Sequence, residues 1–311
     1  MRILITGGAG CLGSNLIEHY LPFGHEIFVI DNFATGNRDV VPAGIPCLTV
    51  VEGSITDMVL VEKCFADFQP SHVIHSAAAY KDLENWREDA DTNVIGSINI
   101  ARAAEHAGVK RVVNFQTALC YGRPDVVPIP VEAPTRPFTS YGISKTAGEQ
   151  FMMMSSVPTV SLRLANITGP RLAIGPIPTF YSRLKEEKSC FCSDTVRDFL
   201  DMEDFIDVMG LMMVEDAPTG IYNISTGEGK TIKDVFDTVA AYLRIDAVDV
   251  PIVPPGDDDV PAVVLDPSKT EADFGWKSKV GFDDTINNML KWYDAYGISA
   301  IHSHLKAPEK T

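Results

Sequence analysis

Short apolar runs recur along the first half of the chain and are separated by segments with helical periodicity. The runs lie at 3–5, 27–30, 47–51, 72–75 and 112–116. The run at 3–5 is too short for a helix and is typical of a buried strand, and the other four segments are also predicted to be strands. Strands that alternate with helices predict an α/β fold, a Rossmann-type doubly wound parallel sheet with a smaller C-terminal α/β lobe.

The intervening segments predict amphipathic helices. After the first strand, Leu16, Ile17, Tyr20 and Leu21 share one face of a helix that begins near Ser14. Further helices are expected from Thr56 or Asp57, over 88–107, from Tyr141 and over 232–246; the segment 266–275 begins a C-terminal helical part, with Phe274 and Trp276 in its core.

A glycine-rich turn joins the first strand to the first helix. Glycine allows a tight turn and lets the backbone approach a pyrophosphate, which then accepts N–H groups of the helix N-terminus. The spacing fits G-x-G-x-x-G from Gly8 or G-x-x-G-x-x-G from Gly7, both ending at Gly13, so it does not choose a family. Asp31 ends the second strand, 18 residues after Gly13. Its carboxylate can bind ribose hydroxyls and repels a 2′-phosphate, which favours NAD over NADP.

Three polar side chains fall where a reaction could occur. Thr117 ends the fifth predicted strand, at the carboxyl edge where parallel sheets bind ligands. Tyr141 and Lys145 are four residues apart and share one face of a helix. A tyrosine is a poor base at neutral pH, and we expect the Lys145 ammonium, together with a nicotinamide charge, to lower the pKa of Tyr141.

Composition excludes some classes of protein. The net charge of −16 argues against nucleic-acid partners, which need basic surfaces. No apolar run reaches the ~18 residues of a membrane span, and a core strand at the N-terminus argues against a signal peptide. The six cysteines lack metal-ligand spacing, and Cys190 and Cys192 are expected to pack rather than bind zinc. We therefore expect a cytoplasmic enzyme with reduced thiols and no metal site.

Taken together, the motifs resemble the extended short-chain dehydrogenase/reductase family, in its nucleotide-sugar epimerase/dehydratase branch. Within this branch the sequence is most similar to bacterial enzymes of lipopolysaccharide O-antigen biosynthesis, and the resemblance covers nearly the whole chain. The matching segments are TGGAGCLG at 6–13, DN at 31–32, HSAA at 75–78, NVIG at 93–96, T-x-x-x-YG at 117–122, Y-x-x-x-K at 141–145, LRLANITGP at 162–170, RDF at 197–199, YNISTG at 222–227 and LDPSK at 265–269.

The resemblance implies two domains and a homodimer. An NAD-binding Rossmann domain would span 1–166. A mainly substrate-binding domain would span 167–311, with parts of about 193–223 and 250–265 returning to the first domain. Relatives dimerise through helices that correspond to about 89–107 and 141–155, and the methionines at 152–154 would otherwise leave apolar surface exposed.

The resemblance also assigns residues to the cofactor. Ser54 stands where the family usually places an Asp that binds the adenine amine, and a serine can also accept a hydrogen bond. The small residues at 76–79 would leave room for a ligand against the backbone. The implied NAD-binding residues are Gly7, Gly10, Cys11, Leu12, Gly13, Asp31, Asn32, Gly36, Ser54, Ile55, Ala77, Ala78, Tyr141 and Lys145.

By the family pattern, Thr117, Tyr141 and Lys145 form the catalytic triad. Tyr141 would take the proton of the sugar 4-hydroxyl while hydride passes to NAD, which gives a 4-keto intermediate. Thr117 would bind the same oxygen, and Lys145 would also hold the nicotinamide ribose. Thr117, Asn166 and Arg197 would contact the substrate, with Arg197 as the clamp on its diphosphate.

The residues after Thr117 distinguish the subfamilies. Dehydratases carry Asp and Glu there, and uronate decarboxylases carry Glu at the second position, whereas this chain has Ala118 and Leu119. An apolar side chain cannot abstract the C5 proton. The resemblance therefore favours NAD-dependent C4 epimerisation of a nucleotide sugar, a UDP-linked hexose or N-acetylhexosamine. The alternatives are a dehydratase or a 4-ketoreductase of the same family and, in another class, a catalytically idle NAD sensor.

Two departures bear on the substrate. The family often has a second diphosphate-binding Arg in the loop that here reads PPGDDD at 254–259, so this loop supplies no second clamp. Val263 aligns with a position that limits the 2-substituent of the sugar, and its small size suggests tolerance of N-acetyl groups. The sugar, the nucleotide, the direction of reaction and the acceptance of uronates stay open. Residues 303–311 are expected to form a disordered tail.

Overall fold

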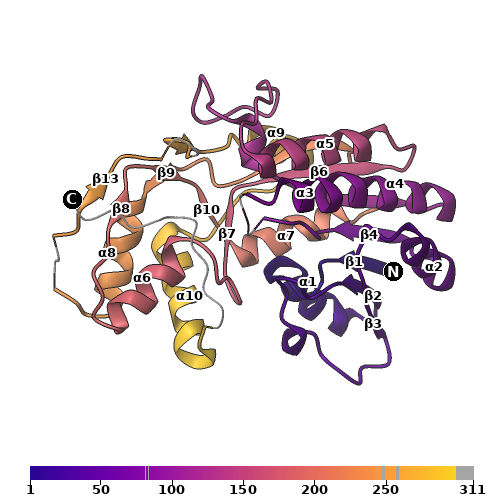
Figure 1. Cartoon of the computed structure of the whole chain (residues 1–311), viewed down its shortest axis with the longest axis horizontal. Coiled ribbons are helices and arrows are strands. Elements are labelled where there is room, and N and C mark those ends of the chain that lie inside the picture. Colours follow the sequence, from indigo (N-terminus) through magenta and orange to yellow (C-terminus); the bar gives the residue numbers. More distant parts are fainter. Residues whose placement is uncertain (81, 83, 247–248, 257–258, 299–311) are drawn as a thin grey trace.

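A seven-stranded parallel sheet forms the centre of the computed structural model (Figure 1), in the order β11-β6-β5-β4-β1-β2-β3. The structure describes residues 1–80, 82, 84–246, 249–256 and 259–298. The order grows outward from β1 in both directions, which confirms the doubly wound sheet and places the topological switch point between β1 and β4. The strands of this sheet are β1 Arg2–Thr6, β2 Glu26–Asp31, β3 Leu48–Glu52, β4 His72–His75, β5 Arg111–Thr117, β6 Thr159–Leu164 and β11 Gly220–Ile224.

Helices cover both faces of the sheet because its inner strands are buried on both sides, whereas the edge strand β3 is largely exposed. Ile3 and Ile5 lie in the core beneath α1 (Cys11–Tyr20) and α7 (Met202–Met212). Leu4 faces the opposite core, which is closed by α2 (Met58–Phe68), α4 (Gly96–Ala107) and α5 (Ser140–Met154). The side chains of β1 thus point alternately into two buried layers, as a continuous apolar run predicts.

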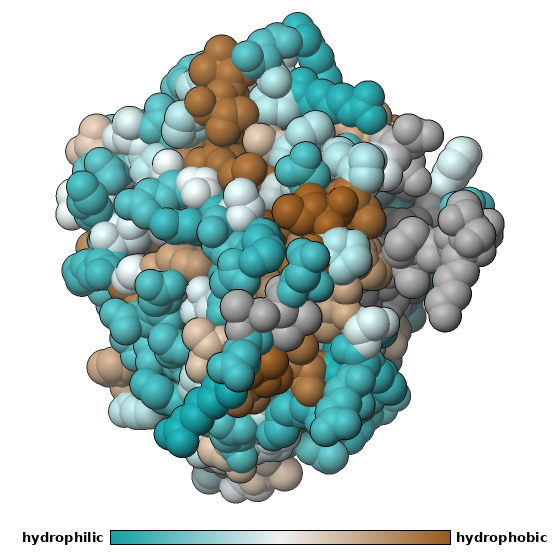
Figure 2. All heavy atoms as spheres, turned by 90° about the vertical axis from the view of Figure 1, so that its left-hand side faces the viewer, coloured by the Kyte–Doolittle hydropathy of each residue, from teal (hydrophilic) through white to brown (hydrophobic). Residues whose placement is uncertain are grey.

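The C-terminal part, built around α6 (Pro176–Lys185), α8 (Ile232–Tyr242) and α10 (Phe282–Tyr296), lies to the left in Figure 1. It has its own apolar core, to which these helices contribute Phe180, Phe236 and Leu290. Figure 2 shows the outer face of this part, where separate apolar patches lie among hydrophilic side chains. Strand β11 returns to the central sheet beside β6. The division into two domains near residue 166 stays a prediction.

The remaining elements are short or belong mainly to this part. They are η1 Leu21–Phe23, η2 Arg38–Val40, α3 Trp86–Asp89, η3 Ala90–Ile95, η4 Ala118–Tyr121, β7 Asn166–Thr168, α6 Pro176–Lys185, β8 Cys192–Ser193, β9 Val196–Arg197, β10 Phe199–Asp201, β12 Lys230–Thr231, α8 Ile232–Tyr242, β13 Ile252–Val253, β14 Ala262–Val263, α9 Ser268–Phe274 and α10 Phe282–Tyr296.

Several element boundaries differ from the sequence prediction. The first helix begins at Cys11 rather than Ser14, because the chain turns into the helix directly after Gly10. The helix predicted over 88–107 begins at Trp86 and contains a π-helical turn, η3. Helix α8 ends at Tyr242, and Arg244 two residues later has a positive φ of 58°. The predicted tail at 303–311 lies outside the described residues.

The predicted core and cysteines can be compared directly with the structure. Trp276 is buried, as predicted, whereas Phe274 is only partly buried and packs at the edge of the core. All six cysteines are free thiols. Within the described ranges, no helix is both long and apolar enough to cross a membrane, and no group of three or more His, Cys, Asp or Glu side chains could hold a metal ion.

Candidate active site

The glycine turn packs tightly against the segment that follows β4. Gly7 has a φ of 70°, and a Cβ atom there would lie 2.7 Å from the backbone nitrogen of Ala77. A Cβ on Gly13 would overlap the Gly7 carbonyl oxygen. No side chain caps the N-terminus of α1, so the N–H groups of its first turn, at Cys11, Leu12 and Gly13, are directed at this cradle. Such a cradle suits a pyrophosphate.

Asp31 ties the end of β2 to the glycine turn. Its Oδ2 accepts a hydrogen bond from the Ala9 nitrogen and its Oδ1 accepts one from the Phe33 nitrogen, both at 2.8 Å. Each carboxylate oxygen has a further acceptor position, so Asp31 can also bind ribose hydroxyls. Gly36 lies against Ala9 in the same corner, while Asn32 is exposed at the end of β2.

Two further predicted NAD-binding residues, Ser54 and Ile55, lie after β3. The Ser54 hydroxyl is 2.8 Å from the Thr56 hydroxyl and accepts a hydrogen bond from the Thr56 nitrogen at 3.2 Å. Ile55 is buried against Gly96, and its carbonyl accepts a hydrogen bond from Asn99 Nδ2 at 2.9 Å. The turn that carries Ser54 and Ile55 is therefore held by α4, beside the same carboxyl edge of the sheet.

A buried network fixes the small residues after β4, and the sequence alone gave no role to three of its members, Thr6, His75 and Ser97. Thr6 Oγ1 accepts hydrogen bonds from the nitrogens of Ser76 and Ala77, both at 3.2 Å, and lies 2.8 Å from His75 Nδ1. His75 Nε2 in turn lies 3.0 Å from the Ser97 hydroxyl. Burial lowers the pKa of His75 to about 3, with a smaller contribution from the Lys145 charge, so this histidine is neutral.

Asn93 extends this network to the helix of the predicted triad. Its Oδ1 accepts from the Ala79 nitrogen at 2.9 Å, and its Nδ2 donates to the Ala79 carbonyl and to the Ser144 hydroxyl, both at 3.0 Å. Asn93 thus joins the segment at 76–79 to α5. Asn93 is the first residue of the NVIG motif at 93–96, but the motif alone did not show what its side chain contacts.

The structure brings the three predicted catalytic residues to the carboxyl end of β5. Thr117 is the last residue of β5, and Tyr141 and Lys145 lie in the first half of α5. Lys145 is buried and donates through Nζ to the Phe115 carbonyl at 2.6 Å. Gln116 Nε2 donates to the Lys145 carbonyl at 2.9 Å. The end of β5 therefore fixes both the backbone and the ammonium of Lys145.

Burial, more than the neighbouring ammonium, determines the pKa of Tyr141. Desolvation raises this pKa, Tyr80 and Asp89 raise it further, and hydrogen bonding with Thr117 opposes the rise. The Lys145 ammonium, which donates to the Phe115 carbonyl, does not offset this rise within the protein itself. The expected lowering of the Tyr141 pKa also requires the nicotinamide charge and stays a prediction. Burial lowers the pKa of Lys145 to about 8, partly opposed by Glu149.

The two predicted substrate residues in the second half of the chain lie on short strands of two different small sheets, β7 paired with β10 and β9 paired with β12 and β14. Asn166 is exposed at the start of β7, and its Nδ2 donates to the Asp198 carbonyl at 2.9 Å. Arg197 is the last residue of β9, and its side chain is 16% exposed. Its guanidinium forms an ion pair with Asp259 and donates to the Val260 carbonyl at 2.7 Å. The predicted diphosphate clamp is therefore paired with a carboxylate of the acidic loop.

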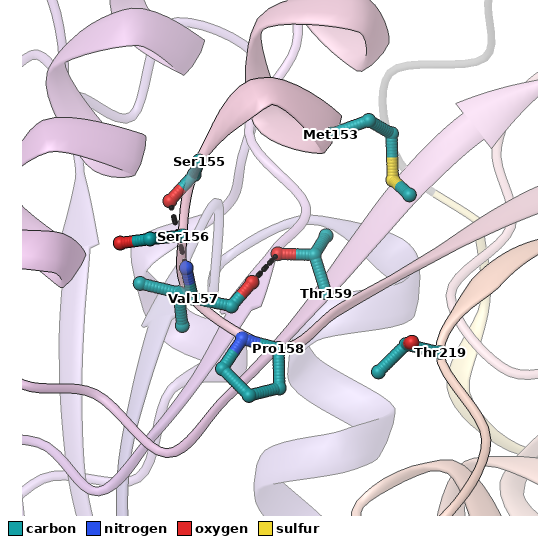
Figure 3. A pocket seen from close by; sticks show the side chains of 7 residues that line it. All are labelled: Met153, Ser155, Ser156, Val157, Pro158, Thr159 and Thr219. Atoms are coloured by element: carbon teal, nitrogen blue, oxygen red, sulfur yellow. Dashed lines mark hydrogen bonds between the residues drawn. The ribbon is translucent and has the colours of Figure 1, made fainter.

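A separate cavity of about 330 Å³ (Figure 3) does not belong to this site. Its lining includes Thr159, the first residue of β6, and Thr219, which precedes β11. These are the amino ends of parallel strands, whereas ligands bind at the carboxyl ends. The cavity therefore lies at the amino ends of the strands, opposite to the carboxyl ends where Thr117 lies.

Known proteins resemble this chain in sequence and in fold. Residues 3–225 match the model of the NAD dependent epimerase/dehydratase family. A UDP-glucose 4-epimerase of Corynebacterium glutamicum is 28% identical, over 89% of this chain and 90% of that protein. The Bordetella bronchiseptica enzyme WbmG, solved with NAD and UDP, is 68% identical with a TM-score of 0.94 and covers 98% of both chains.

A more distant solved structure has the same fold. The UDP-glucose 4-epimerase of Thermotoga maritima, solved with UDP-glucose, is 27% identical with a TM-score of 0.87, over 95% of this chain and 99% of that one. Since the family model spans the central sheet and the site at its carboxyl edge, this chain belongs to the NAD dependent epimerase/dehydratase family.

Proposed function

We propose that this protein is an NAD-dependent C4 epimerase of a nucleotide sugar, a UDP-linked hexose or N-acetylhexosamine. The observation that carries the proposal is the convergence of Thr117, Tyr141 and Lys145 at the sheet edge that also holds the glycine turn. UDP is the proposed nucleotide because WbmG is solved with NAD and UDP, and the Thermotoga maritima epimerase with UDP-glucose.

In this proposal NAD is held by the glycine turn and by five further residues, Asp31, Ser54, Ile55, Ala77 and Ala78. When bound, NAD supplies the hydride acceptor and the positive charge of its ring. Tyr141 takes the proton of the sugar 4-hydroxyl, and Thr117 donates a hydrogen bond to the same oxygen. The raised pKa of Tyr141 keeps the phenol neutral in the protein alone, so the phenolate depends on positive charge supplied at the site. Lys145 contributes to that charge.

The residues that follow Thr117 favour epimerisation over elimination. Ala118 is buried, and Leu119 packs beside the same apolar cluster. Neither side chain can move a proton at C5. The 4-keto sugar therefore rotates in the site and receives hydride on its other face. A 4-ketoreductase is the second candidate, and it would consume NADH in proportion to product.

The substrate side of the site bears on which sugar is bound. Val263 of β14 lies in register with Arg197 of β9, which supports a role beside the diphosphate clamp. We propose that the small side chain of Val263 leaves room for a 2-N-acetyl group.

We further propose that the enzyme is a cytoplasmic homodimer that serves cell-surface polysaccharide synthesis. The dimer is supported by exposed apolar side chains on the outer face of η3 and α5, namely Ile95, Ile143, Phe151 and Met154. Polysaccharide synthesis is supported by the similarity to bacterial O-antigen enzymes.

The test is turnover of a panel of UDP-hexoses, their N-acetyl forms and uronates, with products separated by chromatography. We expect the C4 epimer of at least one substrate and no net change in NADH. The Tyr141→Phe variant should lose about 10²- to 10⁴-fold in kcat while it retains NAD. A stable 4-keto-6-deoxy product, stoichiometric consumption of NADH, or full activity of the variant would each contradict the proposal.

A further inference from the structure

The chain leaves β7 through a tight turn at 169–172 that is held in a strained conformation. The Leu172 nitrogen donates to the Gly169 carbonyl at 3.2 Å. Pro170 occupies the second position, and Arg171 in the third has a φ of 68°. Proline followed by a positive φ is typical of a type II turn, in which the third residue is usually glycine. An arginine there costs free energy that contacts of the turn must offset.

Two residues of α1 supply contacts from the side of the glycine turn. Asn15 Nδ2 donates to the Pro170 carbonyl at 3.0 Å and to the Cys11 carbonyl at 2.8 Å. The Cys11 thiol donates to the same Pro170 oxygen at 3.4 Å. Arg171 Nη1 donates to Asn15 Oδ1 at 3.2 Å. The buried Asn15 amide therefore links the first turn of α1 to both the backbone and the side chain of the 169–172 turn.

The C-terminal part holds the same turn from the other side. The buried Tyr293 of α10 donates through its hydroxyl to the Leu172 carbonyl at 2.5 Å. Asn166, a proposed substrate contact, lies three residues before Gly169 on the strand that leads into the turn. The turn thus lies between the helix end that faces the cofactor cradle and the strand that carries Asn166.

We propose that Asn15 is a positioning residue that couples NAD binding to sugar-nucleotide binding through the 169–172 turn. A pyrophosphate bound to the N–H groups of α1 fixes the first helical turn, and with it the Asn15 contacts that offset the strain at Arg171. The docked turn then holds β7 and Asn166 in place for the nucleotide sugar. Coupling between binding sites is reciprocal, so each ligand raises the affinity for the other by the same factor. This inference rests on the proposed function.

The test measures the coupling itself rather than turnover. The dissociation constant of NAD is determined by equilibrium dialysis of the full-length protein after removal of bound NAD, with and without saturating UDP. In the wild type we expect UDP to tighten NAD binding by about 5-fold or more, the lower end of the usual range for coupled sites. In Asn15→Leu the ratio should fall toward about 1, because both the donor to Pro170 and the acceptor for Arg171 are lost.

Two further variants separate coupling from a loss of structure. Arg171→Gly removes the backbone strain and the contact with Asn15 while α1 stays intact, and it should also lose the coupling. Glu18→Gln changes only the exposed carboxylate paired with Arg171, so it should keep the wild-type ratio. Wild-type ratios in both Asn15→Leu and Arg171→Gly would overturn the inference, as would a ratio of 1 in a wild type that binds both ligands. Failure of the wild type to bind UDP would instead overturn the proposed function.

Discussion

His75 shows how burial decides the chemistry of a single residue. The side chain is fully buried, and its two ring nitrogens lie within hydrogen-bond distance of Thr6 and Ser97. A charged imidazole there would lose its hydration and face the nearby Lys145 ammonium, so burial lowers the pKa of His75 from 6.5 to about 3. In the unfolded chain, by contrast, the imidazole takes up a proton near pH 6.5.

This difference predicts a pH dependence of stability. Because the unfolded chain binds a proton that the folded chain excludes, the contribution of His75 to stability is complete above pH 6.5 and falls as the pH drops toward about 3. The slope is about 1.4 kcal/mol per pH unit. Denaturant unfolding of the wild type and of His75→Asn between pH 4 and 8 checks this, since other groups cancel in the difference. A pH-independent difference would contradict the assignment.

At the scale of elements, the π-helical turn η3 and α5 pack unusually closely. A Cβ atom on Gly148 of α5 would overlap the Asn93 carbonyl of η3 and would lie 2.9 Å from the Ser97 hydroxyl. Glycine at this position therefore allows the close approach. The same contact region holds the Asn93 bonds to Ala79 and Ser144, so helix packing and the alignment of the proposed triad depend on each other.

We expect Gly148→Ala to destabilise the protein by about 1–3 kcal/mol, because the helices must move apart. Displacement of Tyr141 and Lys145 by about 1 Å should also lower kcat by up to about 10²-fold. Gly210→Ala is the matched control, since Gly210 lies in α7 with open space around it. The control should gain about 0.5–1 kcal/mol. Equal changes in the unfolding free energies of the two variants would show that close packing is not the cause.

At the scale of the whole molecule, α5 presents an apolar stripe to the outside. Ile143, Phe151 and Met154 recur at helical spacing and are 53%, 41% and 77% exposed, while Met152 on the opposite face is buried in the core. Ile95 and Trp86 lie on the neighbouring η3 and α3 and are also exposed. A second copy of the chain would cover this stripe.

A charge in the stripe should therefore prevent dimerisation. We expect the wild type to sediment as a dimer at micromolar concentration and Phe151→Glu to sediment as a monomer, because a buried unpaired carboxylate is costly at an interface. Phe23→Glu is the control: Phe23 is 65% exposed on η1, outside the stripe, and this variant should stay dimeric. A monomeric wild type, or a dimeric Phe151→Glu variant, would contradict the proposed interface.

The sequence alone predicted the parts of this protein that depend on local pattern. Runs such as 3–5 and 27–30 predicted buried strands because their apolar residues leave no polar face. The Gly7–Gly13 spacing and Asp31 predicted the cofactor turn because positive φ and close backbone approach need glycine. The spacing of Tyr141 and Lys145 predicted a shared helix face. All of these follow from the periodicity of backbone structure.

The tertiary structure decided what depends on residues far apart in the chain. It showed that burial raises the pKa of Tyr141, that Asp259 pairs with Arg197, and that His75 and Asn93 support the site. It also placed the π-helical turn, which no propensity marks. Desolvation and ion pairing depend on how segments pack around a group, and that packing is not encoded in the spacing of neighbouring residues.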